Sequence, residues 1–148
     1  MKKNIMKNQK GITLIILIIT IIIMSILVTL VINNIDIGED IRNYNYMCAD
    51  IELLESKIMT YYNNYNEIPI DENIGQIANA KSMLAGQADT RDNDVYYKVD
   101  ISKLYNITLN YGGGTLDNKD IYIINEKTHE VYYLKGAVLE GTTYHTKK

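Results

Sequence analysis

Lys10–Ile32 reads KGITLIILIITIIIMSILVTLVI, a long apolar stretch that follows a basic leader. Residues Ile12–Ile32, called the apolar segment below, include only four polar side chains, all hydroxyls: Thr13, Thr20, Ser25 and Thr29. Such hydroxyls can donate to a carbonyl one helical turn earlier, so a helix in lipid tolerates them. At 1.5 Å per residue the segment would extend about 30 Å, the thickness of a hydrocarbon core. We therefore predict a transmembrane helix over residues 12–32.

The apolar segment differs from a cleaved secretory signal. The apolar part of such a signal is about 7–15 residues long and ends at a small-residue cleavage site. Here the first alanine in the chain is Ala49, far beyond the segment. Residues 1–11 contain four lysines and no acid, and positive charge stays on the cytoplasmic side. We expect a retained single-pass anchor in the cell membrane, with a cytoplasmic N-terminus and an extracellular C-terminal domain.

Composition limits what the rest of the chain can do. About 110 residues follow the apolar segment, which is room for one small fold but not for a deep two-lobed enzyme cleft. The net charge is −3, and the leader contributes +4, which leaves −7 on the remainder. That balance argues against nucleic-acid binding, which needs clustered Lys and Arg. Cys48 is the only cysteine, so an internal disulfide and a multi-cysteine metal site are excluded.

The stretch after the apolar segment has the periodicity of an amphipathic helix. Its apolar residues recur at steps of three and four, at Ile41, Tyr44, Met47, Cys48, Ile51, Leu54, Ile58, Tyr61, Tyr62 and Tyr65. Gly38 costs only about 1 kcal/mol relative to alanine, so it need not break the helix. Pro69 marks the stop. We predict one helix of roughly 50 residues, continuing through 33–66; its apolar face would suit core packing or a coiled-coil seam.

The junction Lys10-Gly11-Ile12-Thr13-Leu14-Ile15 resembles the class III leader of type IV pilins and pseudopilins. In that family a short basic leader ends in glycine, a prepilin peptidase cuts after the glycine, and the new terminus is N-methylated. The resemblance implies that 1–11 is a prepilin leader, that cleavage falls between Gly11 and Ile12, and that Ile12 is methylated. It also implies that the retained helix packs against sister subunits in a filament. The residues implied in that assembly are Thr13, Leu14, Ile15, Ile16 and Thr20.

One position departs from the family pattern. The fifth residue after the implied cut is Ile16, where the family normally has glutamate. In the family that carboxylate meets the terminal amine of a neighbouring subunit, and pairing makes a charge in lipid tolerable. Some minor pseudopilins also lack it. Ile16 therefore favours a minor or priming subunit over a major one.

Residues 67–148 are expected to form an extracytoplasmic α/β domain. NYNEIPIDENIGQIANAKSML looks like the turn and short second helix of many pseudopilins, with a weak apolar stripe at Ile74, Ile77, Ala78, Met83 and Leu84. The later runs VYYKV, NITLNY, DIYIIN and EVYYL are β-branched or aromatic and read as strands. Turns are expected at Asn125–His129 and at Glu140-Gly141. The predicted fold class is α+β, a long helix packed on a small C-terminal antiparallel sheet; the final stretch looks like the sheet of Gram-positive pilin-like proteins.

Other polar and aromatic residues give weaker signals. Asp89–Asp94 gathers three carboxylates, which would suit calcium, but it lacks the glycine and distal glutamate of an EF-hand loop, so a solvated loop is favoured. His129 and His145 have no metal-ligand spacing and are expected at the surface. Because strand side chains alternate, Tyr97 and Tyr133 are expected to point outward if Tyr96 and Tyr132 point inward. Cys48 is expected to be a small buried hydrophobe.

These observations together predict a type IV pilin-like protein, a minor pilin or pseudopilin with no catalysis and no cofactor. The partners that the resemblance implies are other pilin subunits, a prepilin peptidase, an assembly ATPase with its membrane platform protein, and membrane lipid. The machine served would be a pilus, a competence apparatus or a secretion system. The alternative is an unprocessed, single-span signal-anchored protein whose extracellular domain binds a ligand or partner. An enzyme is disfavoured, because the sequence contains no recognisable acid, base or nucleophile constellation.

Overall fold

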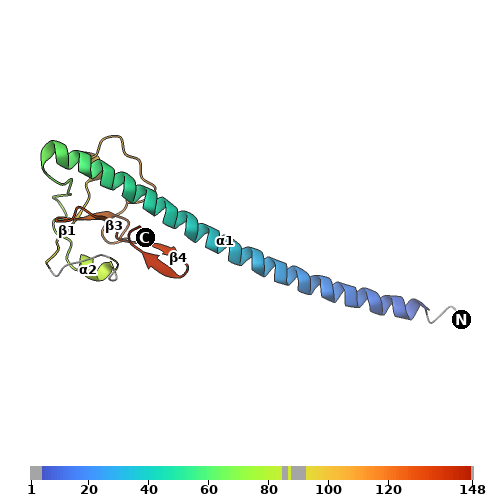
Figure 1. Cartoon of the computed structure of the whole chain (residues 1–148). Helices are drawn as coiled ribbons and strands as arrows, with labels where there is room; N and C mark the ends of the chain where they lie inside the picture. Colours follow the sequence, from blue (N-terminus) through green and yellow to red (C-terminus); the bar gives the residue numbers. More distant parts are fainter. Residues whose placement is uncertain (1–4, 85–86, 88–92, 148) are drawn as a thin grey trace. The chain divides into compact units, whose positions relative to one another are not determined.

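The computed structural model describes residues 5–84, 87 and 93–147, with side chains omitted for 5–11 and 33–36. The chain divides into two compact units, residues 1–39 and residues 40–148. We call the second of these the globular unit. The regular elements are the helices α1 (Ile5–Tyr65) and α2 (Ala80–Met83), the 3-10 helix η1 (Ile101–Lys103), and the strands β1 (Tyr96–Lys98), β2 (Tyr122–Asn125), β3 (Val131–Tyr133), β4 (Ala137–Leu139) and β5 (Thr142–Tyr144) (Figure 1).

The strands form two small antiparallel sheets, so the α+β prediction is confirmed at the level of class. The first sheet has the order β1-β2-β3, and the second pairs β4 with β5. Register in the first sheet places Tyr97 opposite Ile124 and Ile123 opposite Tyr132. Both predicted turns are confirmed, since β2 and β3 flank Asn125–His129 and β4 and β5 flank Glu140-Gly141.

Helix α1 continues through Gly38 and ends at Tyr65, close to the predicted limit. Asn66 terminates it by adopting the left-handed conformation, with φ +55°, and its N–H donates to the carbonyl of Tyr62 at 2.7 Å. Asparagine is one of the few residues that tolerates this conformation at a helix C-terminus. Pro69 then follows at a position where no helical N–H is needed.

The predicted apolar face of α1 forms part of the core of the globular unit. Met47, Ile51, Leu54 and Ile58 are at most 1% exposed and pack with side chains of the first sheet, including Tyr122 and Val131. This favours core packing over the coiled-coil alternative for these positions. The two ends of the predicted face, Ile41 and Tyr65, are exposed.

Both faces of the first sheet are covered, which corrects the prediction that Tyr97 and Tyr133 point outward; Tyr97 is half-buried against the core. Tyr122, Ile124, Val131 and Tyr133 pack toward α1. The alternate residues of the same strands pack on the other face with residues from the 77–84 stretch, as Tyr96, Ile123 and Tyr132. Side chains alternate as expected, but a second apolar layer replaces solvent, and Tyr133 is only 3% exposed.

One predicted strand is wrong, and the predicted short second helix is present but shorter than its apolar stripe suggested. The run NITLNY is not a strand: Asn106 has φ +49°, and Ile107 and Leu109 pack against the core from an irregular segment. The second helix is a single turn, Ala80–Met83, because the preceding residues lie along β1 instead. There Ile70 and Gln76 form bridges with Val99 and Tyr97.

Candidate membrane-spanning and assembly segment

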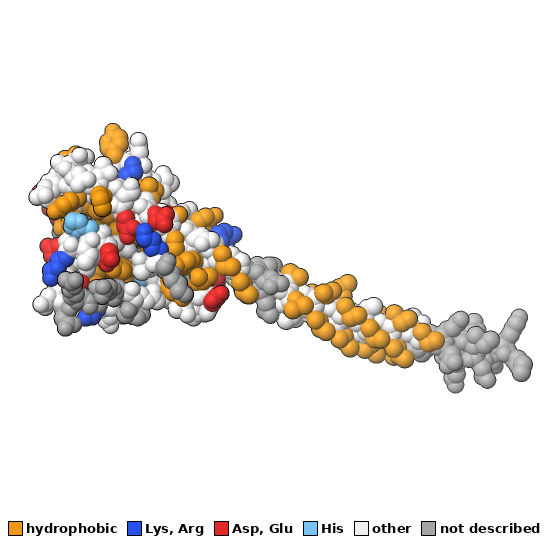
Figure 2. All heavy atoms as spheres, viewed as in Figure 1, with side chains coloured by type: hydrophobic (Ala, Val, Ile, Leu, Met, Phe, Trp, Pro, Cys, Tyr) orange, Lys and Arg blue, Asp and Glu red, His pale blue; other side chains and the backbone are white. Residues whose placement is uncertain are grey.

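The apolar segment Ile12–Ile32 is helical and exposes apolar side chains on every side. Its large apolar residues range from 48% exposed at Ile18 to 67% exposed at Met24. By length and composition, α1 contains a stretch able to cross a membrane. The space-filling view shows apolar side chains along this part of the chain (Figure 2). A helix that is apolar all round needs lipid or other protein around it.

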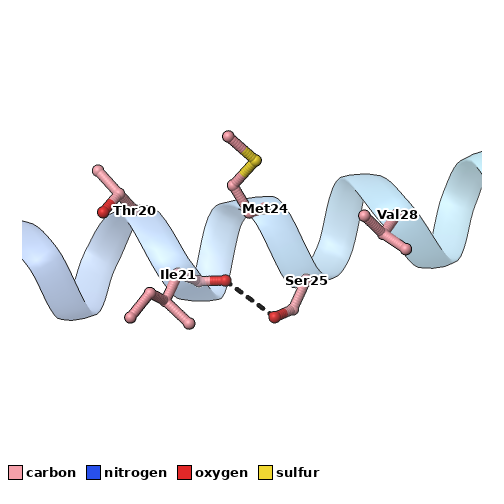
Figure 3. A pocket seen from close by; sticks show the side chains of 5 residues that line it. All are labelled: Thr20, Ile21, Met24, Ser25 and Val28. Carbon is pink, nitrogen blue, oxygen red and sulfur yellow. Dashed lines mark hydrogen bonds between the residues drawn. The ribbon is translucent and has the colours of Figure 1, made fainter.

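Three of the four hydroxyls of the apolar segment donate to a carbonyl of the same helix, as predicted. Thr20 Oγ1 donates to the carbonyl of Leu17 at 2.8 Å. Ser25 Oγ donates to the carbonyl of Ile21 at 2.9 Å, as drawn in Figure 3. Thr29 Oγ1 donates in the same way to the carbonyl of Ser25 at 2.9 Å. These bonds remove the cost of placing the hydroxyl groups in an apolar medium.

A shallow surface hollow lies midway along the segment, beside the short side chains of Thr20 and Ser25. Its lining residues are Thr20, Ile21, Met24, Ser25 and Val28. Figure 3 shows Thr20 and Met24 pointing to one side of the helix, and Ile21 and Ser25 to the other. Small residues allow two helix backbones to approach closely in lipid, where helix association depends on packing. The hollow is therefore a surface on which another helix could pack.

The predicted assembly residues share one environment, since Leu14, Ile15 and Ile16 are 56–60% exposed and Thr13 and Thr20 are also exposed. Ile12 is 56% exposed. Gly11 lies in α1, but its surroundings fall outside the described side chains, as does the start of the leader, residues 1–4. Cleavage after Gly11 and methylation of Ile12 stay predictions.

A buried carboxylate in the globular unit was not predicted. Asp50, on α1, is 2% exposed. Its oxygens accept bonds from the backbone N–H groups of Asn110 and Tyr111 at 2.9 and 3.0 Å, from Asn110 Nδ2 at 2.8 Å, and from the hydroxyl of Tyr122 at 2.8 Å. Asp50 therefore fastens the irregular 104–120 segment to the helix. The only hint in the sequence is an acid that flanks the apolar face of α1 between Met47 and Ile51.

A second carboxylate repeats this arrangement. Asp120 Oδ1 accepts bonds from the Gly112 N–H at 2.9 Å and from the Tyr133 hydroxyl at 2.7 Å. Burial raises the pKa of the Tyr133 hydroxyl above its usual range, and the bond to Asp120 raises it further. Burial likewise raises the pKa of Tyr122, with the Asp50 bond as the next cause. Both phenols therefore stay protonated donors, which suits a structural role.

The remaining candidate residues from the sequence, the two histidines, Cys48 and the Asp89–Asp94 stretch, show no arrangement for catalysis or metal binding among the described side chains. His145 is 5% exposed, with Nδ1 3.0 Å from the carbonyl of Tyr133, so its predicted surface position is wrong. His129 is half-buried against the Tyr62 ring, and Cys48 is half-buried at the core edge. Asp94 accepts a bond from Asn125 Nδ2 at 3.1 Å, whereas the rest of the calcium candidate, up to residue 92, lies outside the described residues. Among the described side chains no group of three or more His, Cys, Asp or Glu could hold a metal.

Comparison with protein-family models, with curated proteins and with solved structures finds no match to this chain. Its function is therefore inferred from its own residues.

Proposed function

We propose that this chain is a type IV pilin-like subunit, a minor pilin or pseudopilin of a surface filament or of a secretion or DNA-uptake pseudopilus. The apolar segment carries the proposal: it is helical, apolar on all sides and exposed, and it directly follows a basic leader that ends at Gly11. The antiparallel strands that follow the same helix add support, because a long N-terminal helix followed by such strands is what the pilin resemblance implies.

In this proposal a prepilin peptidase removes residues 1–11 on the cytoplasmic side and leaves the apolar segment in the membrane. Sister subunits then associate laterally with that segment. Lipid offers no hydrophobic driving force for helix association, so close contact must supply it. The hollow at Thr20 and Ser25 provides such a contact surface. An assembly ATPase and its membrane platform protein would extract the subunit.

Ile16 limits which kind of subunit the chain would be. An isoleucine at the fifth position removes the cost of a carboxylate in lipid, but it also removes a charge that could pair with a neighbouring amine. The subunit would then enter the filament by apolar packing alone. That favours a minor or priming position.

The same residue favours one alternative, an unprocessed signal-anchored protein with an extracellular binding domain. A plain anchor needs no carboxylate at position 16 and gains membrane affinity from isoleucine. In that case the leader would remain attached to the segment. The two functions therefore differ in the covalent state of the N-terminus.

Mass spectrometry of the full chain, isolated from membranes of a host that contains a prepilin peptidase, tests the proposal. We expect a mature N-terminus at N-methylated Ile12. A Gly11→Ala variant should retain its leader, whereas a Gly38→Ala variant, which changes another glycine of α1, should be processed normally. An intact leader on the unmodified chain would contradict the pilin proposal and support the anchor.

A further inference from the structure

Tyr105 forms an exposed aromatic knob on the globular unit. Its side chain is 85% exposed, although the preceding Leu104 is buried. The backbone at this point is held by α1, because Lys57 Nζ donates to the Tyr105 carbonyl at 3.0 Å. A tyrosine on an anchored backbone loses little conformational freedom on binding, and tyrosine is enriched among the residues that dominate protein interfaces. We call Lys57 and Tyr105 together the knob.

A groove with matching chemistry lies between α1 and the β2–β3 turn. Its volume is about 430 Å³. The lining residues are Glu55, Ile58, Met59, Tyr62, Asn63, Thr128, His129 and Glu130, and we call this hollow the Met59 groove. Ile58 is buried at 1% exposure, Met59 is 65% exposed, and the Tyr62 and His129 rings lie 4.6 Å apart. An aromatic side chain would find an apolar and aromatic surface there.

Charge complements this apolar match. Glu55 and Glu130 line the Met59 groove, and Glu55 Oε2 already accepts a bond from the Lys147 ammonium at 2.7 Å. Glu130 Oε2 accepts hydroxyl bonds from Tyr132 at 2.7 Å and from Thr128 at 3.2 Å, which leave its negative charge in place. The knob carries the positive Lys57. A ligand that presents an aromatic ring beside an ammonium group therefore fits the groove, and this chain presents such a pair itself.

The knob and the groove face opposite directions. Lys57 and Met59 are two residues apart on α1, and 3.6 residues per turn places their side chains about 200° apart around the helix axis. Two copies related by a twofold axis therefore cannot each place their knob in the groove of the other. A contact between the knob of one copy and the groove of another is heterologous, and it leaves a free knob and a free groove for further copies.

We propose that the globular units associate head to tail, with Tyr105 of one copy seated in the Met59 groove of the next. This goes beyond the proposed function, because the contact uses neither the apolar segment nor removal of the leader. It would give any assembly of this chain a direction set by the globular units.

Disulfide crosslinking of the full chain in membranes tests this contact, in a background in which Cys48→Ala removes the native thiol. The cysteines are placed beside the contact so that Tyr105 and Met59 are both kept. The double variant Asn106→Cys with Asn63→Cys, which joins the exposed neighbour of Tyr105 to an exposed residue of the groove, should give a ladder of crosslinked oligomers under mild oxidation. The matched control, Asn106→Cys with Thr60→Cys, uses an exposed residue of α1 outside the groove and should give no ladder. Mixing the two single-cysteine chains, one at Asn106 and one at Asn63, should stop at dimers.

Two crosslinking results would overturn the proposal: crosslinking of the double variant no greater than in the Thr60 control, or efficient dimers of the Asn106→Cys chain alone, which indicate a symmetric contact. Tyr105→Ala should weaken self-association of the full chain in detergent about 30-fold, as expected for a central aromatic contact. Unchanged self-association of the Tyr105→Ala chain would also contradict the proposal. Lys57→Glu should weaken association, and adding Glu130→Lys should restore it. The ladder should persist in a Gly11→Ala chain that keeps its leader. Failure of the knob–groove contact can therefore be distinguished from failure of leader removal.

Discussion

The apolar segment and the globular unit handle apolar surface in opposite ways. In the segment every large apolar side chain is at least 48% exposed, and hydrophobicity has no preferred face. In the globular unit the α1 face from Met47 to Ile58 is almost fully buried by the chain's own strands. The first region leaves its apolar surface exposed in this chain, whereas the second buries its apolar surface against its own strands. Identical chemical changes should therefore have different consequences in the two regions.

The two regions also differ in where their polar groups find hydrogen-bond partners. Ser25 satisfies its hydroxyl four residues away within the helix, whereas Asp50 is satisfied by residues 60 to 72 positions away along the chain. A local bond survives wherever the helix exists. A long-range bond exists only when the globular unit is folded, so its loss should be measured in folding stability.

The largest effect is expected from Asp50→Ala. This change leaves the N–H groups of Asn110 and Tyr111 and the Tyr122 hydroxyl without their acceptor. Unsatisfied buried donors cost about 1–3 kcal/mol each, so we expect the free energy of unfolding to fall by about 4 kcal/mol. Denaturant unfolding of the full chain in detergent, followed by tyrosine fluorescence, measures this.

The matched change in the other region is Ser25→Ala, which should leave the unfolding of the globular unit unchanged. Asp50→Asn should be intermediate, because it keeps one acceptor oxygen but points an N–H group at other donors. Equal stability of Asp50→Ala and Ser25→Ala would show that the buried carboxylate does not hold the 104–120 segment.

The next effect compares one substitution at two sites. Ile51→Ala empties a position with 0% exposure, and core changes of this kind cost about 2–5 kcal/mol. Ile22→Ala changes a residue that is 53% exposed in the chain and should not alter the unfolding of the globular unit. Both variants are measured by the same denaturant titration. A loss from Ile22→Ala as large as that from Ile51→Ala would end the distinction between the two regions.

Periodicity predicted the parts of the fold that local pattern controls. Steps of three and four located α1 and its buried face, and polar turns located both hairpins. The NITLNY segment has the composition of a strand. However, the backbone N–H groups of Asn110 and Tyr111 donate to Asp50 and not to the carbonyl groups of a neighbouring strand. Nothing near position 110 in the sequence indicates a partner at position 50. Tyr133 was misplaced for a related reason, since alternation identifies two faces but not what covers each.

The candidate surfaces also differ in whether local sequence pattern could predict them. The helix of the apolar segment was predicted, because its length and composition suffice for that. The knob and the Met59 groove were not, since each joins residues distant in sequence, such as Lys57 with Tyr105 and Met59 with His129. Only the folded chain reveals which exposed side chains are neighbours.

The smallest expected effect is a dependence of stability on pH that belongs to the globular unit alone, since the apolar segment has no ionisable side chain. The hydrogen bond from Lys98 Nζ to Asp71 Oδ2, 3.1 Å long, lowers the pKa of the Asp71 carboxyl below its ordinary value of 3.8. A carboxyl whose pKa is lower in the folded state stabilises the fold above its unfolded pKa. That contribution is lost as the pH falls from about 4 through the lower folded value.

Lys98→Met should therefore destabilise the globular unit by less than about 1 kcal/mol at neutral pH, as is typical of such pairs. The difference from the unmodified chain should shrink as the pH is lowered below 4, where Asp71 becomes protonated in both proteins. Lys103→Met is the control, because Lys103 Nζ donates to the Ile70 carbonyl at 3.0 Å and lies 3.5 Å from Glu72, which is 81% exposed. The effect of Lys103→Met should therefore not depend on the protonation of Asp71. A Lys98→Met difference that is constant from pH 7 to pH 2 would mean that the lysine acts through the packing of its stem and not through its charge.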